Sequence, residues 1–217
     1  MADYSKSDHW SQKAQKEGYP ARSVYKLKEM DEKFGLVKNA RSPFRALDLG
    51  AAPGSWSLYF LRKIPLKASA LEKSGAEPVA PILVSVDLAP LSRQFDEGLF
   101  NRPDFLFIQG DFTTGEIREA IVSPGPYSLI VSDAAPSTTG NRSVDTLRSL
   151  DLAETALHYA ETSLAKGGNL VIKVFQGGDT GTLLRAIRSL FETGKSFKPQ
   201  ACRPGSFETY YLGLGRK

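Results

Sequence analysis

Three carboxylates lie at or just beyond the ends of short apolar runs, at Asp87, Asp111 and Asp133. Such runs are typical of buried strands, and open α/β sheets bind ligands at the carboxyl ends of their strands. At such a place Asp87 could accept both hydroxyls of a ribose, and Asp111 could accept an exocyclic adenine amine. A single aspartate at a strand end more often caps a helix or forms a turn. Three of them beside a glycine-rich loop favour a cofactor site.

The glycine-rich loop is the segment from Asp48 to Trp56, which reads DLGAAPGSW. It follows an apolar run and precedes a helical pattern, the context of a nucleotide-type cofactor loop. Glycine lets the backbone turn sharply and approach a ligand closely. Ala52 and Pro53 occupy the middle of the loop, so it is not the G-x-G-x-x-G pattern that holds a pyrophosphate at a helix N-terminus. A ligand without phosphate fits this loop better.

A lysine interrupts an apolar run near the end of the chain. Lys173 lies in the middle of the segment 170–175, which reads LVIKVF. Lysine is almost never buried without a partner, so this position differs from an ordinary surface charge.

The elements that would position these residues alternate along the chain. Gly35 is placed as the C-cap of a helix with Val24, Leu27, Met30 and Phe34 on one face. No internal repeat is visible, and residues 64–81 read as a long solvated connection. The pattern predicts helices over 5–17, 24–34, 55–63, 116–122, 145–165 and 179–193, and strands over 46–49, 82–86, 105–108, 127–132, 169–175, 196–202 and 207–214. We therefore expect a single α/β domain whose mainly parallel sheet ends in an antiparallel hairpin across Pro204-Gly205.

Composition and charge set outer limits on function. The chain has 217 residues, 41% of them hydrophobic, with one cysteine and two histidines, so we expect no disulfide and no metal site. No run is apolar and long enough for a membrane span or a signal core, which favours a cytoplasmic protein. The net charge of +4 divides into +3 over residues 1–41, −4 over 42–184 and +5 over 185–217. Basic ends indicate a polyanionic partner if the two ends meet in space.

Several motifs together resemble the RrmJ/FtsJ-type ribose 2′-O-methyltransferases, which use S-adenosylmethionine on large-subunit ribosomal RNA. The likeness extends from about residue 9 to the end of the chain. Its most specific motifs are the DLGAAPGSW loop and the segment KVFQG. The matching segments are ARSVYKL from Ala21, LDLGAAPGSWS from Leu47, QGDF from Gln109, VSDAAP from Val131, VIKVFQG from Val171 and SFETY from Ser206.

The resemblance implies a role for particular residues. The family's Lys-Asp-Lys-Glu tetrad falls on Lys26, Asp133, Lys173 and Glu208. Its cofactor residues map to Gly54, Trp56, Asp87, Asp111 and Asp133. The implied fold is a Rossmann-like methyltransferase domain with a seven-stranded sheet, residues 1–41 forming a basic helical N-terminal extension and 42–217 the catalytic core. Two departures are Ser55, where the family commonly has a second glycine, and the long 64–81 connection before Asp87.

Methyl transfer to a ribose hydroxyl needs alignment of three atoms and removal of a proton. We hypothesise that Lys173 takes this proton as a neutral amine. A second role stays open, in which Lys173 orients the hydroxyl and stabilises its developing negative charge. Burial and Lys26 favour the neutral amine, whereas Asp133 and Glu208 favour the ammonium.

The leading function hypothesis is 2′-O-methylation of a uridine ribose in 23S rRNA of the large ribosomal subunit or its precursor, by a monomer. Phosphate contacts would come from Lys6, Lys13, Lys16, Arg22, Lys28 and Arg203. A close alternative is ribose methylation in the tRNA anticodon loop, since such relatives share the tetrad. A non-catalytic RNA-binding assembly factor would be expected to have a broken tetrad. A nicotinamide-dependent oxidoreductase is disfavoured because the G-x-G-x-x-G pattern is missing.

Overall fold

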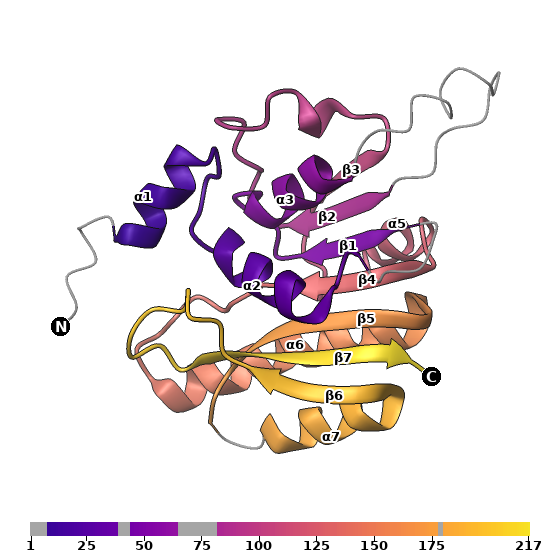
Figure 1. Cartoon of the computed structure of the whole chain (residues 1–217). Coiled ribbons are helices and arrows are strands. Elements are labelled where there is room, and N and C mark those ends of the chain that lie inside the picture. The colour runs from indigo at the N-terminus through magenta and orange to yellow at the C-terminus, as the bar shows by residue number, and fades with distance from the viewer. Residues whose placement is uncertain (1–7, 39–43, 65–81, 178–179) are drawn as a thin grey trace.

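A seven-stranded sheet forms the centre of the molecule in the computed structural model, which describes residues 8–38, 44–64, 82–177 and 180–217 (Figure 1). The strand order is β3-β2-β1-β4-β5-β7-β6. Pairing is parallel from β3 to β5, whereas β7 is antiparallel to both of its neighbours. The strands are β1 Ala46–Leu49, β2 Leu83–Asp87, β3 Phe105–Gln109, β4 Tyr127–Ser132, β5 Leu164–Phe175, β6 Phe191–Phe197 and β7 Glu208–Arg216. The predicted α/β fold class is confirmed.

Helices cover both faces of this sheet. One buried cluster joins α1, α2 and α3 to one face, and a second joins α5, α6 and α7 to the other. In Figure 1 the arrowheads of β1 and β2 point toward the side of the sheet where α1 lies. The helices are α1 His9–Lys16, α2 Val24–Phe34, α3 Ser55–Lys63, α5 Arg118–Val122, α6 Arg142–Ser163 and α7 Thr180–Leu190, with a short 3-10 turn at Leu99–Asn101.

Helix α2 has the capping that its sequence predicts. Val24, Leu27 and Met30 are fully buried. Gly35 adopts a left-handed φ of 65°, and its N–H donates to the Asp31 carbonyl at 2.7 Å. A residue with a Cβ would be strained in this conformation, so the glycine ends the helix at Phe34.

The C-terminal elements differ from the predicted boundaries. The helix expected over 179–193 ends at Leu190, and Gly194 lies within β6, where it pairs with Gly213. A Cβ on Gly213 would overlap the ring of Phe191, so Gly213 leaves room for that buried aromatic side chain. The last two strands pair as predicted, but β7 lies between β5 and β6.

The strand expected over 196–202 stops at Phe197. The backbone N–H groups of Gln200 and Ala201 donate to the Glu29 carboxylate on α2, at 2.7 and 2.8 Å. They are therefore unavailable for pairing between strands. The helix expected over 145–165 ends at Ser163, where α6 runs directly into β5, and this strand begins at Leu164 instead of residue 169. The predicted connection over 64–81 falls outside the described residues, apart from Ile64.

Candidate active site

Strands β5 and β7 present two of the predicted tetrad residues on one face of the sheet. Lys173 of β5 pairs with Tyr210 of β7, and Phe175 pairs with Glu208. Because successive side chains of a strand alternate between faces, Lys173 shares the face of Val171, which belongs to the α2 and α3 cluster. Insertion of β7 antiparallel to β5 brings its first residue, Glu208, to the carboxyl end of β5. This topology unites residues 35 positions apart.

Lys26 approaches the same place from α2. Its ammonium pairs with Glu208 Oε2 at 2.9 Å, and both side chains are about nine-tenths buried. Burial lowers the pKa of Lys26, but the charges of Asp133 and Glu208 outweigh it, so the pKa lies above its ordinary value. Lys26 is therefore a charged, paired ammonium in the folded protein.

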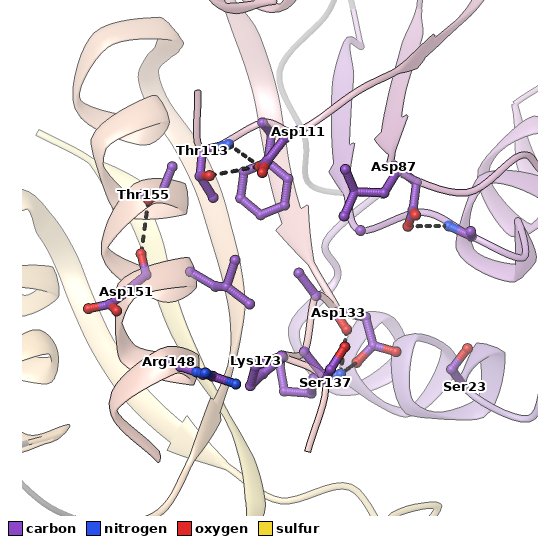
Figure 2. A pocket seen from close by; sticks show the side chains of 18 of the residues that line it. Ser23, Asp87, Asp111, Thr113, Asp133, Ser137, Arg148, Asp151, Thr155 and Lys173 are labelled. Atoms are coloured by element: carbon purple, nitrogen blue, oxygen red, sulfur yellow. Dashed lines mark hydrogen bonds and ion pairs between the residues drawn. The ribbon is translucent and has the colours of Figure 1, made fainter. Parts of the chain in front are cut away.

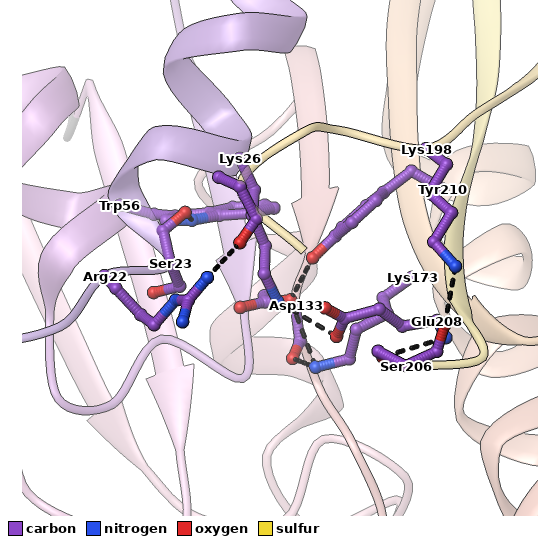
Figure 3. A network of polar contacts seen from close by, with 11 residues as sticks. Arg22, Ser23, Lys26, Trp56, Asp133, Lys173, Lys198, Ser206, Glu208 and Tyr210 are labelled. Atoms are coloured by element: carbon purple, nitrogen blue, oxygen red, sulfur yellow. Dashed lines mark hydrogen bonds and ion pairs between the residues drawn. The ribbon is translucent and has the colours of Figure 1, made fainter. Parts of the chain in front are cut away.

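Asp133 lies at the centre of this cluster, just after β4 (Figure 3). Its Oδ1 pairs with Lys173 Nζ at 3.1 Å and accepts a hydrogen bond from the Tyr210 hydroxyl at 2.6 Å. Lys173 also donates to the Asp133 backbone carbonyl. Burial raises the pKa of Asp133, but Lys173, Lys26 and the Tyr210 hydrogen bond together hold it below its usual value. Asp133 is thus ionised at neutral pH.

A cavity of about 740 Å³ opens beside Lys173 and Asp133 along the carboxyl ends of the strands (Figure 2). Asp87 and Asp111 line it, as does Phe112. Asp87 accepts backbone N–H groups from Ala52 and Ala89, at 2.9 and 2.8 Å, and Asp111 accepts from the backbone and hydroxyl of Thr113. Each carboxylate oxygen has a second lone pair, so both can still accept ligand hydroxyl or amine groups.

The loop after β1 forms one wall of the cavity. Gly50, Ala52 and Pro53 line it. Gly50 has a φ of 76°, and a Cβ there would lie 2.7 Å from Cα of Ala134. Only glycine allows the loops after β1 and β4 to approach this closely. The wall is therefore formed largely by backbone, as the sequence indicates for a ligand that contacts the chain closely.

Two of the predicted cofactor residues lie outside the cavity lining. Gly54 has a φ of 107°, and a Cβ there would lie 2.9 Å from the ring of Phe100. Trp56 is buried in the core, and its Nε1–H donates to the Ser23 carbonyl at 2.8 Å. The structure thus places Gly54 and Trp56 where they shape and support the loop. Asp87, Asp111 and Asp133, by contrast, line the cavity directly.

Sequence reasoning overlooked Tyr210 and Arg148. Tyr210 is two residues beyond Glu208 in a strand, so the same period-two rule would have placed it on the same face. Arg148 lines the cavity from α6, two turns before Thr155. The helical pattern of α6 gives no signal that distinguishes Arg148 from a solvated charge.

Some function classes can be addressed directly. Within the described ranges no helix is long and apolar enough to cross a membrane. Over the same part of the chain, no three histidine, cysteine, aspartate or glutamate side chains gather as metal ligands would.

A sheet of this order, with a lysine–carboxylate cluster and a cavity at the carboxyl ends of its strands, matches the expected α/β methyltransferase class. The FtsJ-like methyltransferase family model matches residues 19–216, and the chain belongs to that family. The predicted family resemblance is therefore confirmed, and the oxidoreductase alternative is excluded.

Named relatives match nearly the whole chain. Ribosomal RNA large subunit methyltransferase E of Treponema denticola is 48% identical over 216 residues, covering 99% of this chain and 97% of the relative. A protein of the same name from Borrelia duttonii is 44% identical, covering 96% of each chain. The crystal structure of a Plasmodium falciparum protein described as a ribosomal RNA methyltransferase superposes with a TM-score of 0.66 at 25% identity, covering 91% of this chain and 98% of that one.

Proposed function

We propose that this protein transfers a methyl group from S-adenosylmethionine to the 2′-hydroxyl of a uridine ribose in 23S rRNA of the large ribosomal subunit or its precursor, acting in the cytoplasm as a monomer. The observation that carries the proposal is the assembled tetrad, in which the Lys26–Glu208 and Lys173–Asp133 pairs lie at 2.9 and 3.1 Å beside the cavity. The names of the relatives, which specify ribosomal RNA of the large subunit, favour this substrate over a tRNA anticodon loop.

The cavity fits the cofactor by its chemistry. Four carboxylates line it against two cations, an excess that suits a ligand with a sulfonium and an ammonium group. Asp87 would hold the ribose hydroxyls and Asp111 the adenine amine. Bound S-adenosylmethionine supplies an electrophilic methyl group. The protein's own contribution is to bind, orient and manage a proton.

Lys173 has one position left to offer the ribose hydroxyl. It donates to the Asp133 carboxylate and the Asp133 carbonyl. The remaining tetrahedral position of Nζ carries a third N–H in the ammonium and the lone pair in the neutral amine. The ammonium would hold the attacking oxygen and stabilise its developing charge. The neutral amine would accept the hydroxyl proton. The ionised Asp133 stabilises positive charge on Lys173, which favours the orienting role.

Substitution of Lys173 by arginine separates these two roles. Arginine keeps the charge but cannot serve as a base near neutral pH. With undermethylated large subunits as substrate, an orienting role predicts that K173R retains a measurable fraction of the wild-type rate and that its rate does not rise with pH. A base role predicts loss of turnover with normal binding of the cofactor.

Mapping of ribose methylation tests the proposed function as a whole. Ribosomal RNA from a strain that lacks the gene should lose 2′-O-methylation at one uridine of 23S rRNA, and the purified protein should restore it on isolated large subunits. Isolated tRNA serves as the competing substrate. Loss of a tRNA methylation with an unchanged rRNA map would refute the proposal.

A further inference from the structure

The cavity presents an electrostatic problem for an RNA substrate. Asp87, Asp111, Asp133 and Asp151 line it, and its two cations are Lys173 and Arg148. RNA is a polyanion, so a phosphate that enters beside these carboxylates is repelled unless a cation receives it. A cation that binds such a phosphate must carry a positive charge that no ion pair already compensates.

Neither tetrad lysine has an uncompensated charge. Lys173 is paired with Asp133 at 3.1 Å, and Lys26 with Glu208 at 2.9 Å. Each positive charge is therefore compensated before the substrate arrives. A phosphate near either lysine would also face the neighbouring carboxylate.

Arg148 differs from both lysines. Among the described residues, its guanidinium makes no hydrogen bond and no ion pair, although it lines the cavity. It contributes to a lowered pKa of Asp145, but the main cause is the hydrogen bond from the Thr139 backbone N–H. Asp151 is the carboxylate of the cavity lining that is closest to Arg148 in the sequence, and it forms no ion pair with Arg148. With respect to the described part of the chain, all five N–H donors of Arg148 are thus available to a ligand.

Arg148 lies at the end of the cavity that contains Lys173. Helix α6 forms one wall, along which Thr155 lies near Thr113 and Asp111 whereas Arg148 points toward Lys173 (Figure 2). Seven residues of helix separate Arg148 from Thr155, a rise of about 10 Å. The adenosine that Asp111 would hold is at the far end of this wall, so the guanidinium faces the substrate side.

We propose that Arg148 binds the 3′-phosphate of the nucleotide that is methylated, an inference that rests on the proposed function. The 3′-phosphate is attached to the ribose carbon next to the one that bears the 2′-hydroxyl. Wherever Lys173 holds that hydroxyl, a phosphate must lie a few ångströms away. The planar guanidinium fork can bind two phosphate oxygens, which fixes the orientation of the ribose as well as its distance.

Three variants test this assignment: Arg148→Ala, Arg148→Lys, and Lys166→Ala as a matched control. Lys166 is an exposed cation at the amino end of β5, whereas the cavity lies at the carboxyl ends of the strands. Large ribosomal subunits from a strain lacking the gene serve as the RNA probe. The measurements are the Kd and KM for subunits at several salt concentrations, and the Kd for S-adenosylmethionine by calorimetry.

R148A should weaken subunit binding about 10-fold, as expected for loss of one charge-assisted bidentate contact. The slope of log K against log salt should fall by about 0.7 to 0.9, the value for one phosphate contact. R148K should keep most of the slope but raise KM, because it keeps the charge without the fork. Cofactor affinity should stay within about twofold of wild type, and K166A should match wild type throughout.

Two results would overturn the assignment while the enzyme remains active. If R148A binds subunits with wild-type affinity and slope, Arg148 is a solvated charge. If it loses cofactor affinity and keeps RNA affinity, the guanidinium holds the cofactor carboxylate instead. A wild-type protein that methylates no rRNA would refute the proposed function, and this inference with it.

Discussion

Asp48 is a buried carboxyl group in β1 whose titration should dominate the pH dependence of stability near neutrality. It is fully buried, and its Oδ2 accepts a hydrogen bond from the Ser57 hydroxyl at 2.8 Å. Its Oδ1 has no hydrogen-bond partner among the described residues. Burial raises its pKa to about 7; the Ser57 hydrogen bond opposes this rise, and the charges of Asp133 and Asp87 add smaller increases.

The sign of the effect follows from proton linkage. The unfolded chain releases the Asp48 proton near a pKa of 3.8, whereas the folded protein holds it until about 7. Folding therefore takes up a proton between these values, and stability falls as pH rises across this window. Between pH 5 and pH 8 this one group should cost roughly 2.5 kcal/mol in the free energy of unfolding. Asp133, whose pKa is lowered, loses its contribution only as pH falls below the ordinary aspartate range, so the two effects do not overlap.

Asp48→Asn removes this titration while retaining the size of the side chain and an acceptor for Ser57. Urea unfolding of wild type and D48N, measured from pH 5 to pH 8, should give a stability difference that shifts in favour of the variant by roughly 2 to 3 kcal/mol across that range. Glu119→Gln, an exposed carboxylate on α5, is the control and should show no such trend. Parallel curves for wild type and D48N would refute the argument, because they would mean that Asp48 is ionised at all these pH values.

Three further substitutions test the contacts of the site. Tyr210→Phe removes the hydrogen bond that helps keep the pKa of Asp133 low, so the acid limb of the pH–rate profile should move to higher pH; an unshifted limb would contradict this. Glu208→Gln leaves Lys26 buried without its nearest countercharge. We expect urea titration to show a loss of roughly 3 kcal/mol in the free energy of unfolding, and the double variant with Lys26→Met should not show this loss. Glu29→Gln loses one of two hydrogen bonds to the connection before β7, and should lower kcat through misplacement of Glu208 while cofactor Kd is unchanged; a normal kcat would show that the connection is held without it.

Local patterns in the sequence predict most of the fold, and the failures have one physical origin. Gly35 ends α2 as predicted because the contact that defines the end is local: its N–H donates to the carbonyl of Asp31, four residues earlier. Gly194 follows a helix in the same way, yet it lies in β6, where it pairs with Gly213 of β7. Residues 200–201 belong to a predicted strand, but Glu29, more than 170 positions earlier, accepts hydrogen bonds from their N–H groups. Contacts that are distant in sequence decide these elements, and no local window contains them.

The predicted site residues divide in a similar way. Asp87, Asp111 and Asp133 could be placed from sequence because strand ends in a parallel sheet share one edge. Trp56 could not, because a helix carries aromatic residues on its buried face whether or not a ligand lies nearby. Its indole N–H is satisfied by the Ser23 carbonyl, so the side chain belongs to the core. Arg148 was overlooked because nothing in an exposed helical position shows that its charge lacks a partner.

The charge distribution along the chain separates affinity from chemistry. The four tetrad residues carry two positive and two negative charges, and the distances of 2.9 and 3.1 Å show that they compensate one another in pairs. A neutral cluster exerts little long-range attraction on RNA, since opposite charges at such short separation cancel beyond a Debye length of roughly 8 Å. In the proposed function, the tetrad would therefore orient a ribose without recruiting the strand. Recruitment would require cations that form no ion pair, and among the described residues Arg148, unlike both tetrad lysines, forms none.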